Sequence, residues 1–227
     1  SRVYTEKPDA RADRSPVTRL DPDFVLPRAG ATRELSTKTV VIVGCGSVGS
    51  QAAKLLATVG VGVLQLVDNE SLWAENIHRH LLGVRHLGLN KASAVAFELA
   101  RAFPHAQFIA HEDPALKLLA LETELFTSAD AILFATGDET LELRCDAVLL
   151  GGPPRIHTWV EPLGLGGHAL ATGVNSGTGC LRCLYERNAE TGLSNSAALV
   201  RPGQSVRRAL AGCGGYFLPF SVIDAAR

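Results

Sequence analysis

A run of β-branched apolar residues that leads directly into a glycine-rich loop constrains the fold of this chain more than any other feature. Residues 40–43 are continuously apolar, which is typical of a strand buried on both faces. Residues 44–49 have the pattern Gly-x-Gly-x-x-Gly, and apolar residues between Val48 and Val59 then recur at helical spacing. The sequence therefore predicts a strand, a tight loop and a helix over residues 47–59.

Each glycine of this loop has an expected role in nucleotide binding. Gly44 allows the tight turn, Gly46 lets a phosphate approach the backbone, and Gly49 lets the helix pack closely on the strand. The amide N–H groups at the start of the helix, beginning at Ser47, are free to bind the phosphate. The alternative is a glycine-rich turn that binds nothing.

An acidic residue follows at the position where a nucleotide site needs one. A second predicted strand, residues 63–67, ends at Asp68, which lies 24 residues after Gly44. A carboxylate there suits the ribose hydroxyls. The loop and the acid together indicate a nucleotide, but they do not choose between NAD and ATP, and a dehydrogenase is the default interpretation.

Strands and helices alternate along the rest of the first two thirds of the chain. This alternation predicts a Rossmann-like, doubly wound α/β fold with a mostly parallel sheet, helices on both faces and antiparallel strands added in the C-terminal part. The further strands expected are 107–110, 131–135, 156–160 and 165–172, and the further helices expected are one after an N-cap at Asn90, 114–126, 139–150 and one from about Ser221.

Composition and length set the domain organisation. The 227 residues suffice for one large domain, and we expect an irregular, proline-rich arm over residues 1–36 and the nucleotide-binding domain over residues 37–227, with its C-terminal end truncated. The net charge of −1 gives no indication of nucleic-acid binding, and no apolar run is long enough for a membrane span. Five cysteines without a secretory signal favour a reducing, cytoplasmic location.

Three polar residues that follow the second strand favour ATP over NAD. Asn76, Arg79 and Lys91 add an amide and two fixed cations to a site that would otherwise rely on backbone donors. Lys91 falls in the first turn of its helix, where the helix dipole disfavours a cation by about 0.3–1 kcal/mol, and a bound polyanion would reverse that penalty. The alternatives are a solvated surface lysine at position 91 and an ordinary surface ion pair at Arg79.

These motifs resemble a known family. Val-Asp-x-Glu at 67–70, Asn-x-x-Arg-His at 76–80 and Gly-x-x-Lys-Ala at 88–92 follow the glycine loop in the order found in the adenylation domain of ThiF, MoeB and the ubiquitin-activating enzymes. The resemblance covers residues 38–227. The segment Asn-Ile-His-Arg-His-Leu-Leu-Gly at 76–83 looks most like the bacterial branch of this family. Members of that branch are fused to, or encoded beside, ubiquitin-conjugating-type proteins, as in anti-phage CBASS operons.

The resemblance implies a role for each polar residue. It implies that Asp68 holds the ribose of ATP, that Asn76, Arg79 and Lys91 hold the triphosphate, and that Asp138 coordinates Mg²⁺. Asp138 also reads as a helix N-cap, and the two roles are compatible. The family is homodimeric and supplies an arginine from the N-terminal arm to the partner's site, for which Arg28 is the first candidate and Arg19 the second.

The cysteines divide by context. Cys45 and Cys145 read as packing residues. Cys180 and Cys183 have the spacing of half a zinc site, but the second Cys-x-x-Cys pair that completes this site in the family is missing. Cys213 lies between glycines, and by resemblance it is the acceptor of a thioester. The alternatives for Cys213 are a packing cysteine and a zinc ligand.

The function that the resemblance implies is two-step activation of a ubiquitin-like protein. Its C-terminal glycine carboxylate attacks the α-phosphate of Mg-ATP, and the thiolate of Cys213 then takes the carrier from the adenylate. A ubiquitin-conjugating-type protein would receive it. The alternatives are a sulfur-carrier adenylyltransferase of the thiamine or molybdopterin type, a non-catalytic nucleotide-binding adaptor and an oxidoreductase. His78 and His80 flank Arg79 and either touch phosphate or are structural.

Overall fold

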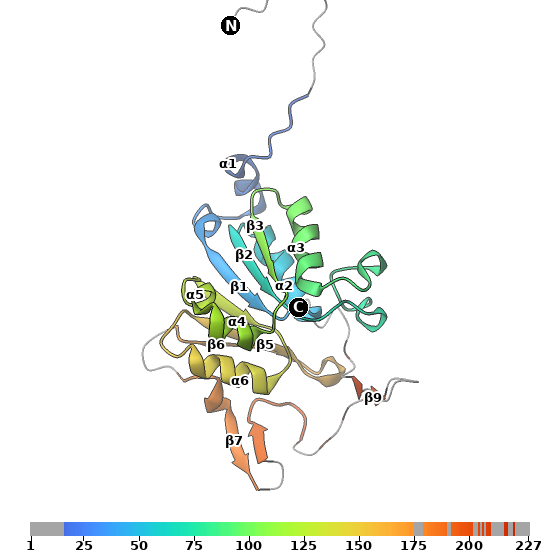
Figure 1. The fold of residues 1–227 in the computed structure, drawn as a ribbon, viewed down its shortest axis with the longest axis vertical. Helices are drawn as coiled ribbons and strands as arrows, with labels where there is room; N and C mark the ends of the chain where they lie inside the picture. The colour runs from blue at the N-terminus through green and yellow to red at the C-terminus, as the bar shows by residue number, and fades with distance from the viewer. Residues whose placement is uncertain are drawn as a thin grey trace, which may run out of the picture.

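Six strands form the central sheet of the molecule (Figure 1). The computed structural model describes residues 16–174, 179–189, 192–201, 204, 206, 208, 209, 216, 217 and 220. The strand order is β3-β2-β1-β4-β5-β6, with all pairs parallel except β5 and β6, so the predicted fold class is confirmed. The strands are β1 (Thr39–Val43), β2 (Val63–Val67), β3 (Gln107–His111), β4 (Ala131–Phe134), β5 (Arg155–Val160) and β6 (Gly167–Thr172).

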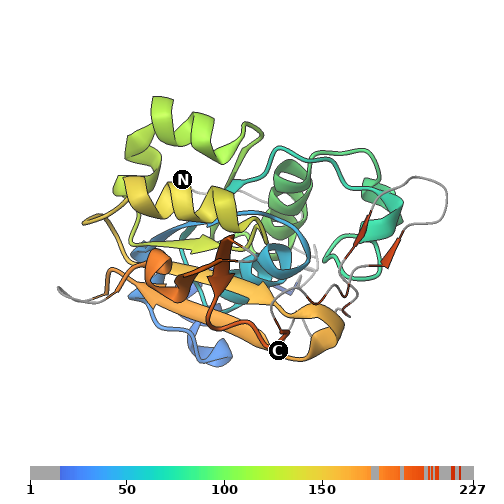
Figure 2. The same cartoon turned by 90° about the horizontal axis from the view of Figure 1, so that it is seen from below.

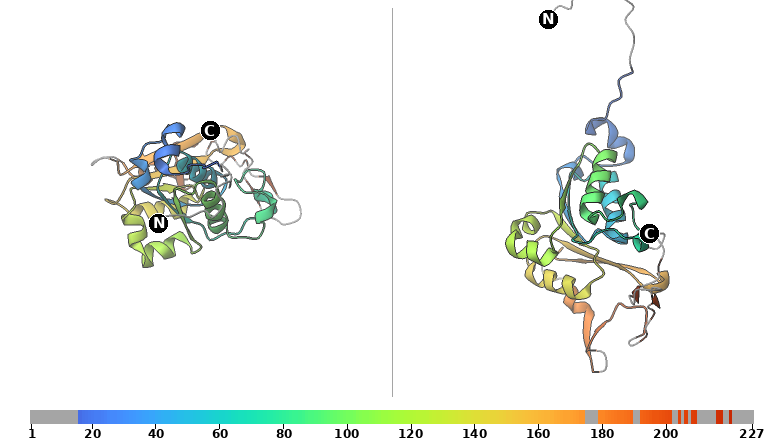
Figure 3. Two further views of the ribbon diagram at one scale, coloured as in Figure 1. Left: turned by 90° about the horizontal axis from the view of Figure 1, so that it is seen from above. Right: turned by 45° about the vertical axis from the view of Figure 1, so that its right-hand side comes forward.

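Helices cover both faces of this sheet (Figure 3). Alternate residues of β1 belong to different cores, because successive side chains of a strand point to opposite faces. Ile42 packs in the cluster that includes α2 and α3, and Val41 and Val43 pack in the cluster that includes α4, α5 and α6. The helices are α2 (Ser47–Thr58), α3 (Lys91–Ala102), α4 (Ala115–Leu121), α5 (Thr123–Thr127) and α6 (Glu139–Val148).

The helix predicted over residues 114–126 is two helices in the structure. The break falls at Glu122, whose backbone has φ −131° and ψ 49°. The hydroxyl of Thr123 donates to the carbonyl oxygen of Leu119 at 2.7 Å and so takes the acceptor that the next backbone N–H of a continuous helix would use. No glycine or proline marks this position, which explains why the sequence pattern gave no sign of it.

The N-terminal arm contains more regular structure than the sequence predicted. Its described part forms α1 (Pro22–Val25) and a 3₁₀ turn at Pro27–Ala29, and both begin with a proline. We expected these prolines to keep the segment irregular, but proline also fits the first turn of a helix. Leu26 is buried against Gly60, at the edge of the sheet where the parallel strands begin.

The segment after β6 departs most from expectation. It contains two small antiparallel pairs, β7 (Tyr185–Asn188) with β8 (Gly192–Asn195) and β9 (Arg208–Ala209) with β10 (Tyr216–Phe217). These strands have only two to four residues each, too few to show a recognisable alternation. The helix predicted near Ser221 lies outside the described residues.

The connection between β2 and α3 is a long excursion that carries the residues of the second and third motifs. Residues 69–90 extend to the opposite side of the molecule from α4 and α6 (Figure 2). Within the described parts of the chain, no helix has the length and apolar character needed to cross a membrane.

Candidate functional site

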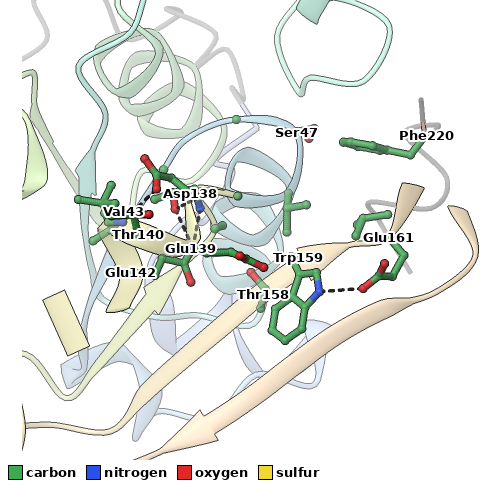
Figure 4. A pocket seen from close by; sticks show the side chains of 18 of the residues that line it. Val43, Ser47, Asp138, Glu139, Thr140, Glu142, Thr158, Trp159, Glu161 and Phe220 are labelled. Atoms are coloured by element: carbon green, nitrogen blue, oxygen red, sulfur yellow. Dashed lines mark hydrogen bonds between the residues drawn. The ribbon is translucent and has the colours of Figure 1, made fainter. Parts of the chain in front are cut away.

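A large pocket opens at the carboxyl ends of β1, β2 and β4 (Figure 4). β1 lies between β2 and β4 in the sheet, so the loops after these strands run to opposite sides of β1. Ligands of open α/β sheets bind where the loops diverge in this way. The pocket encloses about 1040 Å³, enough for a nucleotide. The predicted site residues in its wall are Gly44, Gly46, Ser47, Asp68, Asn76, Arg79, Lys91 and Asp138.

The three glycines of the loop have different surroundings. Gly44 has a φ of +91°, and a Cβ there would lie 2.7 Å from the carbonyl oxygen of Ala135. Gly49 is buried, and its Cβ would lie 1.8 Å from the carbonyl oxygen of Gly44. Gly46 lines the pocket and has no atom within 4 Å of its Cβ position. Gly44 and Gly49 therefore allow the loop to close on itself, while Gly46 leaves the backbone open to a ligand.

A buried histidine fixes the glycine loop from behind. The Nε2 atom of His80 lies 2.6 Å from the carbonyl oxygen of Cys45, and Nδ1 accepts the N–H of Leu82 at 3.1 Å. Nε2 therefore carries the proton and donates a hydrogen bond to the carbonyl oxygen of Cys45. Burial lowers the pKa of His80 to about 4, so the ring is neutral. With both ring nitrogens in use, His80 is structural, while His78 is exposed.

Asp68 ties the end of β2 to the glycine loop. Its Oδ2 accepts the N–H of Cys45 at 2.7 Å, and its Oδ1 accepts the N–H of Glu70 at 2.8 Å. Burial raises the pKa of the Asp68 carboxyl above its ordinary value. Each carboxylate oxygen still has a lone pair, so both can accept a hydroxyl in addition. The ribose role stays a prediction, and the side chain lines the pocket as that role requires.

Lys91 is not the solvated surface residue that the sequence left open. Its side chain is 9% exposed, and Nζ lies 2.5 Å from Oε2 of Glu70. Glu70 thereby offsets the unfavourable position of Lys91 at the start of α3, so a bound polyanion is not needed to explain it. Glu70 is itself 69% exposed and lines the pocket, so an incoming phosphate could replace it as the partner of Lys91.

Asn76 and Arg79 come from the excursion between β2 and α3. The side-chain oxygen of Asn76 accepts the N–H of Trp73 at 3.0 Å, which leaves its amide nitrogen available to the pocket. Arg79 is half-buried, and its guanidinium lies 5.6 Å from the ring centre of Phe220. The described residues contain no carboxylate within ion-pair distance of Arg79, so the surface ion pair considered for it is not formed among them.

Asp138 is an N-cap and a pocket residue at the same time. Its Oδ1 accepts the N–H of Leu141 at 2.9 Å, which caps α6. Among the residues that the structure describes, Oδ2 has no hydrogen-bond partner. A carboxylate oxygen at the wall of a nucleotide-sized pocket is the kind of ligand that Mg²⁺ prefers. The donor set therefore fits the magnesium role, which remains a proposal.

Sequence reasoning missed one wall of the pocket. Trp159 and Glu161 come from the end of β5 and the turn after it, and both line the cavity (Figure 4). The indole N–H of Trp159 donates to Oε1 of Glu161 at 3.1 Å, and the indole ring stacks on His168 with 4.5 Å between ring centres. The only signal for this wall was its position at the carboxyl end of a parallel strand.

The remaining predicted site residues lie elsewhere. Arg28 belongs to the arm at the opposite edge of the sheet, where its guanidinium stacks on Phe24, and it does not line the pocket. The thiols of Cys180 and Cys183 lie 3.9 Å apart, but no cluster of three or more metal-binding side chains exists within the described residues. Cys213 lies outside the described residues, so the structure does not place the predicted thioester cysteine.

Comparison with known proteins places these observations in a family. The ThiF family matches residues 22–214. The chain is 30% identical over 212 residues to the ATP-dependent ubiquitin transferase-like protein Cap2 of Pseudomonas aeruginosa, covering 90% of this chain and 36% of Cap2. It is 33% identical over 175 residues to the adenylyltransferase and sulfurtransferase uba4 of Aspergillus niger, covering 72% of this chain and 36% of uba4.

A solved structure with the same fold is that of E. coli MccB, with a TM-score of 0.56 and 24% identity over 67% of this chain and 46% of MccB. The chain spans about a third of the length of the curated relatives it matches. The family match extends over most of the chain and includes the glycine loop, the excursion after β2 and the turn at Asp138. The chain therefore belongs to the ThiF family.

Proposed function

We propose that this chain binds ATP in the pocket and adenylates the C-terminal carboxylate of a small carrier protein. The observation that carries the proposal is the convergence of a phosphate loop, a ribose-type acid, the cations Arg79 and Lys91 and the carboxylate of Asp138 on one cavity. The similarity to Cap2, an ATP-dependent ubiquitin transferase-like protein, supports this nucleotide and this class of reaction.

The reaction needs alignment and charge neutralisation more than it needs a general base. A terminal carboxylate is already ionised at neutral pH and can attack the α-phosphate of ATP, so that an acyl-adenylate forms and pyrophosphate leaves. The backbone N–H groups of the glycine loop, Arg79 and Lys91 stabilise the phosphate charges in the transition state. Mg²⁺ held by Asp138 would neutralise further charge on the phosphates.

We further propose that the carrier is ubiquitin-like and passes from the adenylate to Cys213 as a thioester. The Cap2 match supports this because it covers 90% of the chain, whereas the uba4 match covers 72%. The uba4 relative favours the second candidate, a sulfur-carrier adenylyltransferase, at a similar level of identity. A homodimer in which Arg28 enters the partner's pocket, and a ubiquitin-conjugating-type acceptor, complete the first proposal.

ATP–pyrophosphate exchange tests the first step. Purified chain is incubated with labelled pyrophosphate, Mg-ATP and small proteins that end in glycine and are encoded beside its gene. We expect carrier-dependent exchange in the wild type and its loss in Asp138→Asn. Asp130→Asn is the matched control, because Asp130 lies at the opposite end of β4 and contacts Lys38 and the N–H of Thr39. Equal exchange by wild type and Asp138→Asn would contradict the role of Asp138.

Non-reducing gels test the second step. A carrier that exchanges pyrophosphate should form a conjugate with the wild type that a thiol reductant releases, and Cys213→Ala should not form it. Cys183→Ala is the control, because Cys183 is the exposed cysteine among the described residues. A reducible conjugate that survives Cys213→Ala would move the thioester to another cysteine. Exchange without any conjugate would favour the sulfur-carrier alternative.

A further inference from the structure

A chain of hydrogen bonds runs from Asp138 at the pocket wall, through Thr136, to the side chain of Glu142. The backbone N–H of Asp138 donates to the hydroxyl oxygen of Thr136 at 3.0 Å. That hydroxyl donates to Oε1 of Glu142 at 2.7 Å, and the same oxygen accepts the N–H of Thr136 at 3.2 Å. Glu142 thus holds the turn of residues 136–138 at two points. The turn needs such support because Gly137 has a φ of +68° and contributes no side chain of its own.

Glu142 is in turn fixed by a buried histidine. Its Oε2 lies 3.0 Å from Nδ1 of His157, and Nε2 of His157 lies 3.4 Å from Oδ1 of Asp146. Both ring nitrogens face carboxylate oxygens, an arrangement that favours a proton on each nitrogen. Burial disfavours the charged ring, but the hydrogen bonds to Asp146 and Glu142 outweigh it and raise the pKa of His157. The ring also stacks on Phe134, with 4.9 Å between centres.

The network ends at an arginine of β5 and at a backbone N–H in the segment after β6. Nε of Arg155 donates to Oδ1 of Asp146 at 2.6 Å, and Oδ2 of Asp146 accepts the N–H of Leu181 at 3.1 Å. When His157 is protonated, carboxylates and cations alternate along the network. Glu142 is 6% exposed and Asp146 is 2% exposed.

Stability alone is a weak reason for this arrangement. Buried ion pairs gain little over apolar residues of the same volume, because removing the charges from water offsets most of their attraction. A directional network does what apolar packing cannot do, since it fixes the position of specific polar atoms. The atoms at the pocket end of the network belong to Thr136 and, through it, to Asp138.

We propose that Glu142, acting through the hydroxyl of Thr136, is a positioning residue that holds Asp138 with its Oδ2 directed to the phosphate side of the pocket. This inference rests on the proposed function, because it assigns Glu142 to the step in which Asp138 binds Mg-ATP. Glu142 also lines the pocket, but in this role it acts through Thr136 and not by its own contact with the nucleotide. Polar groups that orient a metal ligand typically change metal affinity or activity by about 10–100-fold when they are removed.

Removal of one hydroxyl gives the sharpest test. Thr136→Val keeps the volume and the buried charges but breaks the link from Glu142 to Asp138. We expect calorimetric titration to show about tenfold weaker binding of Mg-ATP. Binding of AMP without magnesium should stay unchanged, because Asp68 and the glycine loop do not depend on this link. Thr136→Ser restores the hydroxyl and should restore the affinity for Mg-ATP.

Glu142→Gln provides the second variant, and we expect the same selective loss for Mg-ATP. Glu98→Gln is the matched control, because it breaks a Glu–His pair of similar length, 3.1 Å to His86, that does not line the pocket. Equal losses for Mg-ATP and AMP would overturn the inference, since general loosening of the fold affects both ligands. Unchanged Mg-ATP binding in both Thr136→Val and Glu142→Gln would overturn it as well.

A binding-independent readout separates this inference from the proposed function. Hydrogen exchange at the amide of Asp138 should be faster in Thr136→Val than in the wild type, because this amide loses its acceptor. If the wild type binds no Mg-ATP, the proposed function fails, and unchanged exchange at this amide would show that the positioning network fails too. If the wild type binds Mg-ATP but the variants lose nothing, only the positioning role is refuted.

Discussion

The same substitution at two glycines of one loop should give opposite results. Gly46→Ala and Gly49→Ala each add one methyl group, three residues apart. At Gly49 the added Cβ would lie 1.8 Å from the carbonyl oxygen of Gly44, and real Cβ contacts are essentially never under 3.0 Å. Backbone must therefore shift by about 1 Å, because neither the loop nor the helix can rotate a side chain out of the way.

The size of the effect at Gly49 follows from two opposing terms. Alanine is favoured over glycine inside a helix by about 1 kcal/mol. Overpacking in a rigid site costs about 1–3 kcal/mol or more, and a clash with backbone belongs at the upper end. We expect a net loss of about 2 kcal/mol in the free energy of unfolding. For a domain of this size the melting temperature should fall by about 4–8 °C.

Gly46→Ala should leave the fold intact and weaken nucleotide binding. Gly46 has a φ of −73°, which alanine adopts without strain, and its Cβ position has no neighbour within 4 Å. The cost in stability should stay below about 1 kcal/mol, the difference between these residues at an N-cap. The methyl group enters the space next to the loop amides, so Mg-ATP should bind severalfold more weakly.

Two measurements on the same samples decide between these expectations. Thermal unfolding should rank Gly49→Ala well below the wild type and Gly46→Ala close to it. Calorimetric titration of Gly46→Ala with Mg-ATP should show reduced affinity at unchanged stability. Equal melting temperatures for both variants would refute the packing argument, and wild-type affinity in Gly46→Ala would refute the phosphate approach to this backbone.

Three further results follow from burial and charge. Lys91→Met should weaken Mg-ATP binding about tenfold, measured by titration, at little cost in stability because its partner Glu70 is left exposed to water. Alkylation followed by mass spectrometry should modify exposed Cys183 well before Cys45, because burial raises the pKa of the Cys45 thiol well above its ordinary value. Burial alone would raise the pKa of Asp146, but hydrogen bonds from the buried network outweigh burial and lower this pKa to about 2. The ionised Asp146 therefore contributes its full stabilisation above about pH 4, and this stabilisation is lost as the pH falls toward 2. Between pH 6 and pH 3 the free energy of unfolding, measured with urea, should fall by about 1 kcal/mol more in the wild type than in Asp146→Asn. Equal decreases in both proteins would contradict the assignment of this pH dependence to Asp146.

Local patterns predicted the parts of the fold that local interactions determine. The glycine loop, its flanking strand and helix, and the N-cap at Asn90 all appear where expected, and the side chain of Asn90 accepts the N–H of Ser93 at 3.0 Å. The order of motifs along the chain also brought the predicted phosphate-binding residues to one pocket, because loops after parallel strands meet at one edge. The break in the helix at Glu122 escaped prediction because the feature that accompanies it is a single hydrogen bond, from the hydroxyl of Thr123 to the carbonyl oxygen of Leu119.

The buried network could not be predicted for a different physical reason. Glu142 and Asp146 are one helical turn apart on α6, a spacing that normally describes a solvated face. Their partners, Arg155 and His157, are alternate residues of β5 and therefore point to the same face of the sheet. Only the packing of α6 on that face brings the four charges together, and no sequence pattern on either element reports it.

This arrangement makes the cap of α6 the point at which we expect the site to be most sensitive to substitution. One oxygen of Asp138 is committed to the helix, through the N–H of Leu141, and this bond fixes the carboxyl group relative to α6. Glu142 is on the same helix and holds the turn before Asp138 through Thr136. The helix thus holds its own cap from two sides, at a residue that lines the pocket. A shift of α6 relative to β5 would break the pairing of His157 with Glu142 and move Asp138 at the same time. The position of the proposed magnesium ligand is therefore a property of helix–sheet packing, and substitutions in β5 that never touch the nucleotide should alter Mg-ATP binding.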